Sequence, residues 1–481
     1  MENKKPNILW ICTDQQRFDT LGCYGNKFVN TPVLDKLAEE GALFETAISQ
    51  SPVCSPSRGC FLTGRYPNTC RTRQNGADIP DTEVLVTKLF HENGYYCGLS
   101  GKLHIRACNP KSGCTEIESR IDDGYDEFHW SHDTAPLWGL HNEYYHWLDS
   151  KFGKTYTTGK SKESKWVEYG MPVEQSQSYW CAEKAIDFIK QNQGRPWLFS
   201  VNMYDPHHPF DPPKELFDTY LKNLEDLPLP IYTEGEEKGK TIWQQQDNTG
   251  AYNHHAGHPF SEMNEKDHRM LKAAYYAMCD NIDIQVGRML EALKETDQYG
   301  NTIIVFHSDH GEMLGDHGIY LKGPFFYDCC IRVPLIISWP EHIKPARYSQ
   351  LVELMDIPET LLELCGYERY EGMQGTSFVP LLEGKKEVLH KNAYSDYMNA
   401  MPWHRDPIAY ASMVRTEDWK LIVSHAGNGE GELYDLKKDP AEQHNLFHLP
   451  AYRDIKLELY AQLLDRWAQQ VDPFPVRKSD W

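Results

Sequence analysis

Four apolar segments that each run into a polar cluster constrain the fold of this chain more than any other feature. They occupy residues 7–12, 95–99, 197–203 and 302–306, and helical patterns separate them. Continuous apolar runs are typical of strands buried on both faces, and their alternation with helices predicts an α/β fold: a mostly parallel central sheet with helices on both faces. Parallel strands end at the same sheet edge, so the polar clusters are expected to meet there. The residues placed at that edge are Asp14, Lys102, His207 and Asp309.

The pattern of predicted strands and helices changes after Gly375. Three short strand patterns and then one helical pattern follow, at 410–415, 419–424, 432–435 and 453–470. This succession predicts a smaller C-terminal α+β subdomain with a short antiparallel sheet. We therefore expect two domains, 1–375 and 376–481.

Two stretches of the larger part, 107–177 and 212–262, lack a clear period and are rich in His, Trp and Tyr. Long segments of this kind in a compact domain are often functional loops. They are expected to be irregular insertions beside the polar edge of the sheet.

Composition sets broad limits on the class of protein. The chain has 481 residues, 40% hydrophobic and 25% charged, as in an ordinary globular protein with room for two domains. A formal net charge of −21 argues against a nucleic-acid partner. No run of about 18 apolar residues occurs, which predicts no membrane span.

The cysteines and the N-terminus bear on the compartment. The 13 Cys are scattered and odd in number, so no disulfide framework is predicted. The first six residues lead directly into a strand pattern without the hydrophobic region of a signal peptide. This predicts a cytoplasmic protein, or a periplasmic one if a leader has been removed, and the sequence leaves the two open.

The stretch from Cys54 to Arg65 predicts a short helix with a reactive group at its start. Pro56 suits the first turn, and Gly64 suits a left-handed C-terminal stop. Free N–H groups and the positive end of the helix dipole then favour an anion beside Cys54, and the Arg58 guanidinium suits sulfate or phosphate. A thiol in this setting is acidified and reactive. For an isolated residue, a buried structural cysteine is the alternative.

Two of the polar clusters predict a metal site. Asp14 and Gln15 follow one strand, while Asp309 and His310 follow another. Their side chains offer oxygen ligands and one imidazole, which suit Ca²⁺, Mg²⁺ or Mn²⁺ better than structural Zn²⁺. Each Asp alone is more typical of a helix cap or a turn, but as a set bracketing Cys54 they favour the metal.

The pattern Cys-x-Pro-Ser-Arg at 54–58, followed by Leu-Thr-Gly-Arg at 62–65, resembles the signature of type I sulfatases of the alkaline phosphatase superfamily. The resemblance extends from Pro6 to Leu446 and includes Gly-Glu-Leu-Tyr-Asp-Leu at 431–436. It implies that 1–375 is the catalytic sulfatase domain. It also implies that a sulfatase-maturating enzyme oxidises Cys54 to formylglycine, and that the hydrate of this aldehyde is the nucleophile.

In the family, one Ca²⁺ ion contacts the formylglycine and a sulfate oxygen. The resemblance assigns this ion to Asp14, Gln15, Cys54 (as formylglycine), Asp309 and His310. The chain departs from the family pattern twice, because an Asp is common at position 15 and an Asn at position 310. One carboxylate fewer and one nitrogen donor more make Mn²⁺ an alternative to Ca²⁺.

The resemblance also implies roles for basic residues. It assigns catalysis to Arg58, Lys102, His104, His207 and Lys322, and substrate contacts to Asn75 and His208. Lys102 and His104 are two residues apart, so an extended segment would point both to one face. His104 would then deprotonate the hydrate. His207 lies in a Pro-His-x-Pro stretch whose histidine protonates the leaving oxygen.

The substrate is the open part of the resemblance. The Asp14-Gln15 and Asp309-His310 pairs resemble those of phosphonate monoester and phosphodiester hydrolases, but these carry Tyr-x-Thr where this chain has Lys102-x-His104. The Asp-Gln start also resembles bacterial enzymes that remove 2-O-sulfate from the uronic acid of glycosaminoglycan disaccharides. We expect a sulfuric ester hydrolase acting on such heparin, heparan or chondroitin oligosaccharides. A phosphonate or phosphodiester hydrolase and a non-catalytic glycan-binding relative are the alternatives.

Overall fold

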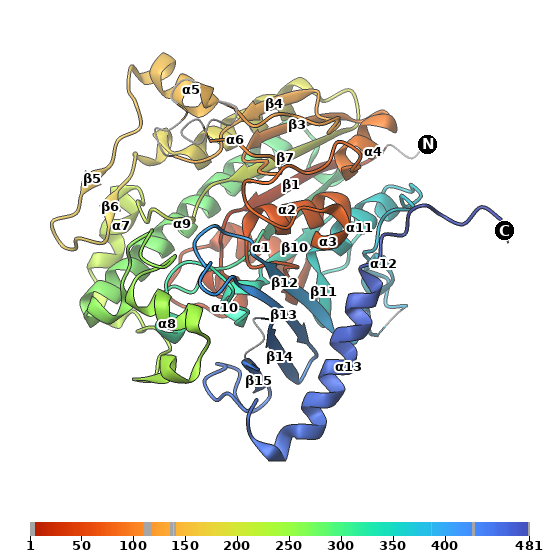
Figure 1. Ribbon diagram of the computed structural model, residues 1–481. Helices are drawn as coiled ribbons and strands as arrows, with labels where there is room; N and C mark the ends of the chain where they lie inside the picture. The colour runs from red at the N-terminus through yellow and green to blue at the C-terminus, as the bar shows by residue number, and fades with distance from the viewer. Residues whose placement is uncertain are drawn as a thin grey trace.

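The chain folds around a nine-stranded sheet in the computed structural model, which describes residues 5–109, 117–134, 138, 141–385, 387–425 and 429–479. The strand order is β11-β2-β10-β8-β1-β7-β3-β4, and β9 pairs with β2 outside this path. Figure 1 labels β11, β10, β1, β7, β3 and β4 of this sheet. The strands are β1 Asn7–Thr13, β2 Ala42–Ile48, β3 Tyr96–Gly101, β4 Glu127–Trp130, β7 Trp197–Met203, β8 Thr302–Ser308, β9 Arg332–Val333, β10 Leu335–Ser338 and β11 Ala346–Glu353.

The four strands expected to end in polar clusters lie side by side. Strand β1 pairs in parallel with β7 and β8, and β3 pairs in parallel with β7. Their carboxyl ends therefore meet at one sheet edge, and the predicted mostly parallel sheet is confirmed. Strand β10, a further short apolar run, differs from these four strands because it runs antiparallel to both β8 and β2. The prediction missed β2 and β11, because β2 is interrupted by a Glu and a Thr and only the second half of β11 is buried.

Helices cover both faces of the sheet, as predicted. On β1, Leu9 and Ile11 join one apolar cluster while Ile8 and Trp10 join another, because successive strand residues point to opposite faces. The first cluster holds side chains of α1 (Pro32–Glu39), α6 (Gln177–Gln191) and α9 (Glu265–Glu295), and the second holds those of α2 (Cys54–Thr63), α4 (Val86–Glu92) and α11 (Ile357–Leu364).

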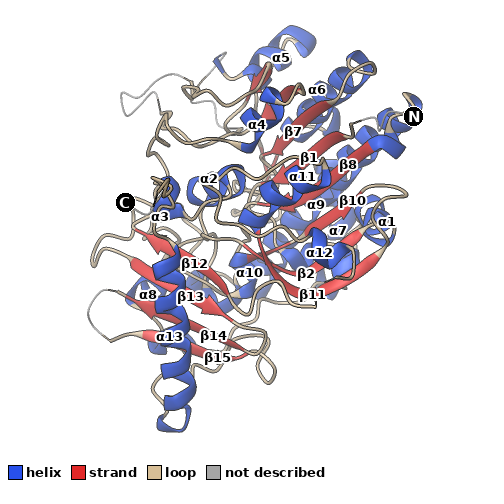
Figure 2. Ribbon diagram, turned by 90° about the vertical axis from the view of Figure 1, so that its right-hand side faces the viewer, coloured by secondary structure: helices blue, strands red, loops and turns tan. Residues whose placement is uncertain are grey.

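A smaller antiparallel sheet, β12-β13-β14-β15, lies at the C-terminal end of the chain, with α13 packed along it (Figure 2). Its elements are β12 Ala393–Met398, β13 Tyr410–Arg415, β14 Trp419–Ser424, β15 Gly431–Asp435 and α13 Arg453–Gln469. The predicted C-terminal sheet is confirmed with one strand more than expected. That strand, β12, has no continuous apolar run to signal it. The domain boundary at 375 stays a prediction.

The two stretches predicted to be irregular contain short regular elements, so that prediction was wrong in part. The first includes α5 (Glu143–Phe152), β5 (Gly159–Lys160) and β6 (Glu168–Tyr169); the second includes α7 (Lys214–Leu221) and α8 (Ile242–Thr249). In α5, local caps mark both ends: the Asn142 side chain caps its start, and Gly153 ends it with a φ of 60°.

The remaining short helices are α3 (Pro67–Cys70), α10 (Asp328–Ile331) and α12 (Val379–Leu382). Within the described ranges, no helix combines the length and apolar character needed to cross a membrane.

Candidate active site

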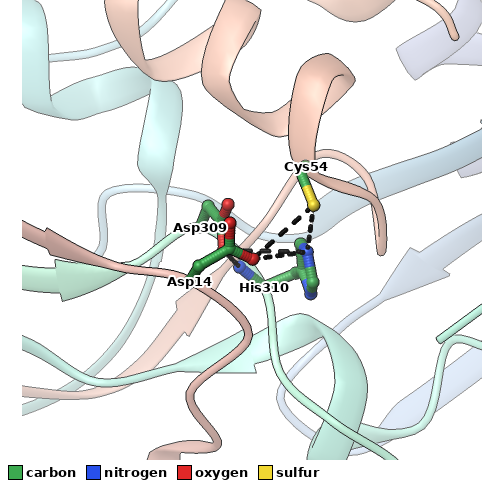
Figure 3. A group of neighbouring side chains, drawn as sticks. All are labelled: Asp14, Cys54, Asp309 and His310. Carbon is green, nitrogen blue, oxygen red and sulfur yellow. Dashed lines mark hydrogen bonds and ion pairs between the residues drawn. The ribbon is translucent and has the colours of Figure 1, made fainter. Parts of the chain in front are cut away.

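Four buried side chains from three elements meet at the carboxyl edge of the sheet: Asp14, Cys54, Asp309 and His310 (Figure 3). Asp14 follows β1, Cys54 is the first residue of α2, and Asp309 and His310 follow β8. Their potential ligand atoms all lie within 4.8 Å of one another. The sequence thus placed the polar residues of two strands and the helix start in one site.

Strand pairing explains why the two aspartates meet. Thr13 pairs with Ser308 in the β1–β8 register, so the residues that follow each of them leave the sheet together. The Asp309 amide then donates to the Thr13 carbonyl at 3.2 Å, and the Gln15 amide donates to Asp309 Oδ1 at 3.0 Å. These bonds fix both carboxyl groups on the same side of the sheet edge.

Helix α2 points its first turn at this edge. It begins after the extended residue Val53 and ends at Gly64, which has a φ of 68° and a backbone bond back to Cys60, as predicted. The Asn75 side chain accepts from the Ser55 amide at 3.0 Å, so Asn75 lies at the mouth of the helix. The positive end of the helix therefore faces the site.

Three buried cations surround the carboxylates. Arg58 Nε donates to Asp309 Oδ2 at 2.9 Å, and Lys102 Nζ lies 2.6 Å from Asp14 Oδ2. Lys322 Nζ lies 2.7 Å from Gln15 Oε1 and 2.9 Å from Cys54 Sγ. The three cations outnumber the two carboxylates of Asp14 and Asp309, so these five side chains together carry a net positive charge beside residue 54.

These charges fix each other's protonation. Burial alone would raise the pKa of Asp14, but Lys102 and the other cations hold it well below its ordinary value. Burial and Asp14 likewise oppose a thiolate at Cys54, yet Lys102 and Lys322 outweigh them and lower the pKa of this thiol. The cysteine therefore lies in the acidifying environment that its position at the helix start predicted.

His207 and His208, predicted to protonate the leaving group and to contact the substrate respectively, lie next to Lys322. His207 Nδ1 lies 2.5 Å from the His208 carbonyl, where it donates, so Nε2 is the atom that faces Lys322 Nζ at 2.9 Å. Burial, and after it Lys322, lowers the pKa of His207 well below its ordinary value. The ring of His208, the next residue in the chain, stacks on the His207 ring with a centroid distance of 4.1 Å.

The segment that carries His104 does not have the predicted conformation. The φ of His104 is 59° and that of Gly101 is 101°, so the segment 101–104 is not extended. The His104 ring stands edge-on to His132 at 4.5 Å, and its Nδ1 has no hydrogen-bond partner among the described residues. The inference that Lys102 and His104 share one face of an extended strand is therefore wrong, because two left-handed residues turn the chain there.

Sequence reasoning missed two carboxylates that position these groups. Glu312 accepts from Gln15 Nε2, and its other oxygen accepts from the amides of Leu314 and Leu321. Glu118 accepts from the amides of the segment after Lys102, at His104, Ile105 and Arg106. Glu312, three residues after Asp309, could have been found from its place in that polar cluster. Glu118 lies in the first insertion and gives no comparable signal.

The donor set fits one divalent cation. His310 Nε2 lies 3.1 Å from Cys54 Sγ, 3.9 Å from Asp14 Oδ1 and 3.7 Å from Asp309 Oδ1. Adjacent ligands of an octahedral ion with bonds of about 2.3 Å lie about 3.3 Å apart, so the spacing is that of a single coordination shell. Two carboxylates and one imidazole are suitable donors for such an ion.

Comparison with known proteins decides the family. The family model described as Sulfatase matches residues 6–367, and the model described as N-sulphoglucosamine sulphohydrolase, C-terminal, matches 315–469. The chain belongs to the sulfatase family. An arylsulfatase of Clostridium perfringens is 31% identical to this sulfatase, covering 94% of this chain and 92% of that protein. An N-acetylglucosamine-6-O-sulfatase of Bacteroides thetaiotaomicron is 26% identical over 99% of this chain and 89% of that protein.

Solved structures agree on the fold of this sulfatase. The phosphonate monoester hydrolase of Agrobacterium radiobacter superposes with a TM-score of 0.83 and 25% identity, covering 98% of this chain and 97% of that one. A 2-O GAG sulfatase superposes with a TM-score of 0.75 and 23% identity, covering 99% and 95%. The family makes the protein a sulfuric ester hydrolase and implies a metal ion and a formylglycine. The roles of single residues stay predictions.

Proposed function

We propose that this sulfatase removes the 2-O-sulfate from a uronic acid in glycosaminoglycan oligosaccharides, using a formylglycine made from Cys54. The observation that carries the proposal is the set of buried cations, Arg58, Lys102 and Lys322, gathered around residue 54 at the start of α2. Fixed cations and free helix N–H groups stabilise the charge that develops on sulfate oxygens. Two similar proteins, an N-acetylglucosamine-6-O-sulfatase and a 2-O GAG sulfatase, support a sugar sulfate as the substrate class.

The cation would be held by Asp14, Asp309 and His310, with Gln15 and residue 54 beside them. When bound, the ion and the formylglycine hydrate supply a polarising charge and a nucleophilic oxygen. Oxygen donors favour Ca²⁺, and the imidazole of His310 keeps Mn²⁺ as the alternative. Arg58 bonds to both carboxylates and holds them in place for this purpose.

The basic residues of the site then have separate roles in the reaction. Lys102 and Lys322 hold the sulfate oxygens and orient the sulfur toward residue 54. His207 gives a proton from Nε2 to the departing sugar oxygen, since its Nδ1 is engaged by the His208 carbonyl. In the free site Lys322 disfavours a proton on Nε2; the negative charge of a bound sulfate ester offsets Lys322 and makes that proton available. His104 removes the proton that allows sulfate to leave.

One other reaction has a specific observation in its favour. The phosphonate monoester hydrolase of Agrobacterium radiobacter has the higher TM-score of the two structures described above. The Asp14-Gln15 and Asp309-His310 pairs suit that chemistry too. The Lys102-x-His104 pair favours the sulfate ester, because the phosphonate hydrolases that these pairs resemble carry Tyr-x-Thr at the matching positions, and Lys102 adds a buried cation beside Asp14.

The test is a substrate panel for protein produced with a sulfatase-maturating enzyme. Mass spectrometry of the Cys54 peptide first verifies the conversion of thiol to aldehyde. Released sulfate is then measured for disaccharides sulfated at uronate O2 or at glucosamine O6, and released phenol for a phenyl phosphonate, with C54A as the control. We expect the uronate 2-O-sulfate to have the highest kcat/KM. Better turnover of the phosphonate than of every sulfated sugar would overturn the proposal.

A further inference from the structure

A strained turn beside the leaving-group histidines presents an aromatic side chain to the site. Tyr252, Asn253 and His254 follow one another with φ values of 55°, 51° and 70°. Left-handed backbone costs about 1 kcal/mol for each non-glycine residue and persists only where neighbouring groups enforce it. Here the Asp247 carboxylate enforces it, because it accepts from the Tyr252 amide at 3.2 Å and the Asn253 amide at 2.9 Å.

The same carboxylate ties this turn to the C-terminal sheet. His404 Nε2 lies 3.1 Å from Asp247 Oδ2, and its Nδ1 lies 3.2 Å from the hydroxyl of Tyr397 on β12. Both His404 and Asp247 are 0% exposed. The loop after α8 and the loop after β12 are therefore held as one unit, although they lie far apart in the sequence.

This unit stacks two aromatic rings next to the catalytic histidines. The rings of Tyr252 and Trp403 are 4.5 Å apart and inclined by only 6°. Tyr252 also meets His208 edge-on at 5.6 Å, and His208 stacks on His207. Trp403 is half-buried, so part of its indole remains accessible. A continuous row of rings thus leads from His207 outward to Trp403.

The loop after β12 also contacts Asn75, the residue that holds the start of α2. The Asn75 amide donates to the Ala400 carbonyl at 2.9 Å, and the Asn75 side chain holds the Ser55 amide. Trp403 is three residues further along the loop from Ala400. The row of rings is therefore fixed to the element that carries residue 54.

Tyr252 offers a hydroxyl donor in this row of rings. The residue is 3% exposed, and its hydroxyl has no hydrogen-bond partner among the described residues. Burial, and then the negative charges of Glu312 and Cys54, raises the pKa of its phenol, so the hydroxyl stays protonated and is available as a donor. A buried hydroxyl without a partner is costly unless a ligand completes it.

We propose that Tyr252 and Trp403 form the specificity site for the sugar that carries the sulfate: the Tyr252 hydroxyl donates to an oxygen of the sugar, and the Trp403 indole covers an apolar face of its ring. The inference rests on the proposed function and deepens it. An apolar wall with one placed donor is the usual construction of a small-ligand site. The site lies beyond His207, which is the leaving-group side of the reaction.

The test compares a large and a small substrate on the matured enzyme. The variants are W403A, Y252F and the control W467A, which removes an indole that is 45% exposed on α13. Each is assayed for kcat and KM on a 2-O-sulfated disaccharide and on p-nitrophenyl sulfate. The small ester reports the state of residue 54 and its cations, because it has no sugar to place.

We expect W403A to lower kcat/KM for the disaccharide about tenfold, mainly through KM, with the aryl ester within about twofold of wild type. Y252F should lower disaccharide turnover about fivefold and spare the aryl ester. W467A should change neither. Wild-type values for W403A and Y252F on the disaccharide, or equal losses on both substrates, would overturn this specificity site while the proposed function stands. Wild-type enzyme that turns over no sulfated sugar would overturn the proposed function and the specificity site with it.

Discussion

The buried pair of Arg58 and Asp309 supports a quantitative prediction for stability. Replacing Arg58 by methionine keeps the side-chain volume but removes a cation from the centre of the protein. Deleting one partner of a buried ion pair costs about 3–5 kcal/mol, because the other charge is left uncompensated. We expect R58M to lower the free energy of unfolding by about 3 kcal/mol, at the low end of this range.

The contacts explain why the low end applies. Both side chains are at most 1% exposed, so the range for a buried pair applies. The variant would lose the Nε bond to Asp309 Oδ2, the bond from Nη1 to the Lys102 carbonyl at 2.8 Å and the longer bond from Nη2 to Asp14 Oδ2 at 3.4 Å. Asp309 Oδ1 would keep the amides of Gln15 and His310, at 3.0 and 2.9 Å. The carboxylate thus loses one of the three donors described here and keeps two.

Urea unfolding in the presence of a chelator measures the effect for R58M, D309N and the double variant. An asparagine at 309 carries no charge to leave unpaired, so the double variant should lose about 2 kcal/mol less than the sum of the single losses. The control R71M removes a surface arginine, 52% exposed, from its pair with Glu83, and should cost less than about 1 kcal/mol. Strict additivity of R58M and D309N would refute the reasoning, because it would mean that the two side chains do not stabilise each other.

Two further predictions concern other buried carboxyl groups. The variant E312Q should bind Ca²⁺ about 10- to 100-fold more weakly in a calorimetric titration, since an amide facing the Leu314 and Leu321 amides cannot also hold Gln15; unchanged affinity would exclude Glu312 as a positioning residue. Burial raises the pKa of Asp396 to about 8, above its value of about 3.9 in an unfolded chain. The folded state therefore holds this proton more tightly, and the stability it supports below pH 4 is lost as the pH rises toward 8. The urea midpoint of wild type should fall relative to D396N between pH 5 and pH 8, and parallel curves would contradict this.

The sequence predicts the centre of the site better than its surroundings. Asp14, Lys102, His207 and Asp309 could be placed together because each follows a buried strand and parallel strands share an edge. That inference needs only the local period of the chain and one rule of sheet geometry. Cys54 and Arg58 could be joined to them through the resemblance to the sulfatase signature, while the helix signals at Pro56 and Gly64 predict only the short helix that carries them.

What the sequence could not predict depends on contacts between distant loops. The turn at 101–104 follows from left-handed residues and from Glu118, whose amide partners are invisible in a pattern. The antiparallel direction of β10 is not encoded in its apolar run. Tyr252 and Trp403 meet only because Asp247 and His404 bond to each other across 157 positions. These contacts join residues that are distant in the sequence, so no local sequence pattern predicts them.

The depth of Cys54 restricts when it can be converted. The residue is 1% exposed, and the neighbouring Ser49 and Ser57 hydroxyls both donate to the Asp309 carbonyl, which locks the segment onto the end of β8. Another protein's active site could not reach the thiol without pulling this segment away from the sheet. We therefore infer that the proposed oxidation of Cys54 precedes the docking of the segment that carries Asp309, and that a folded molecule still carrying the thiol would have to open this segment to be converted.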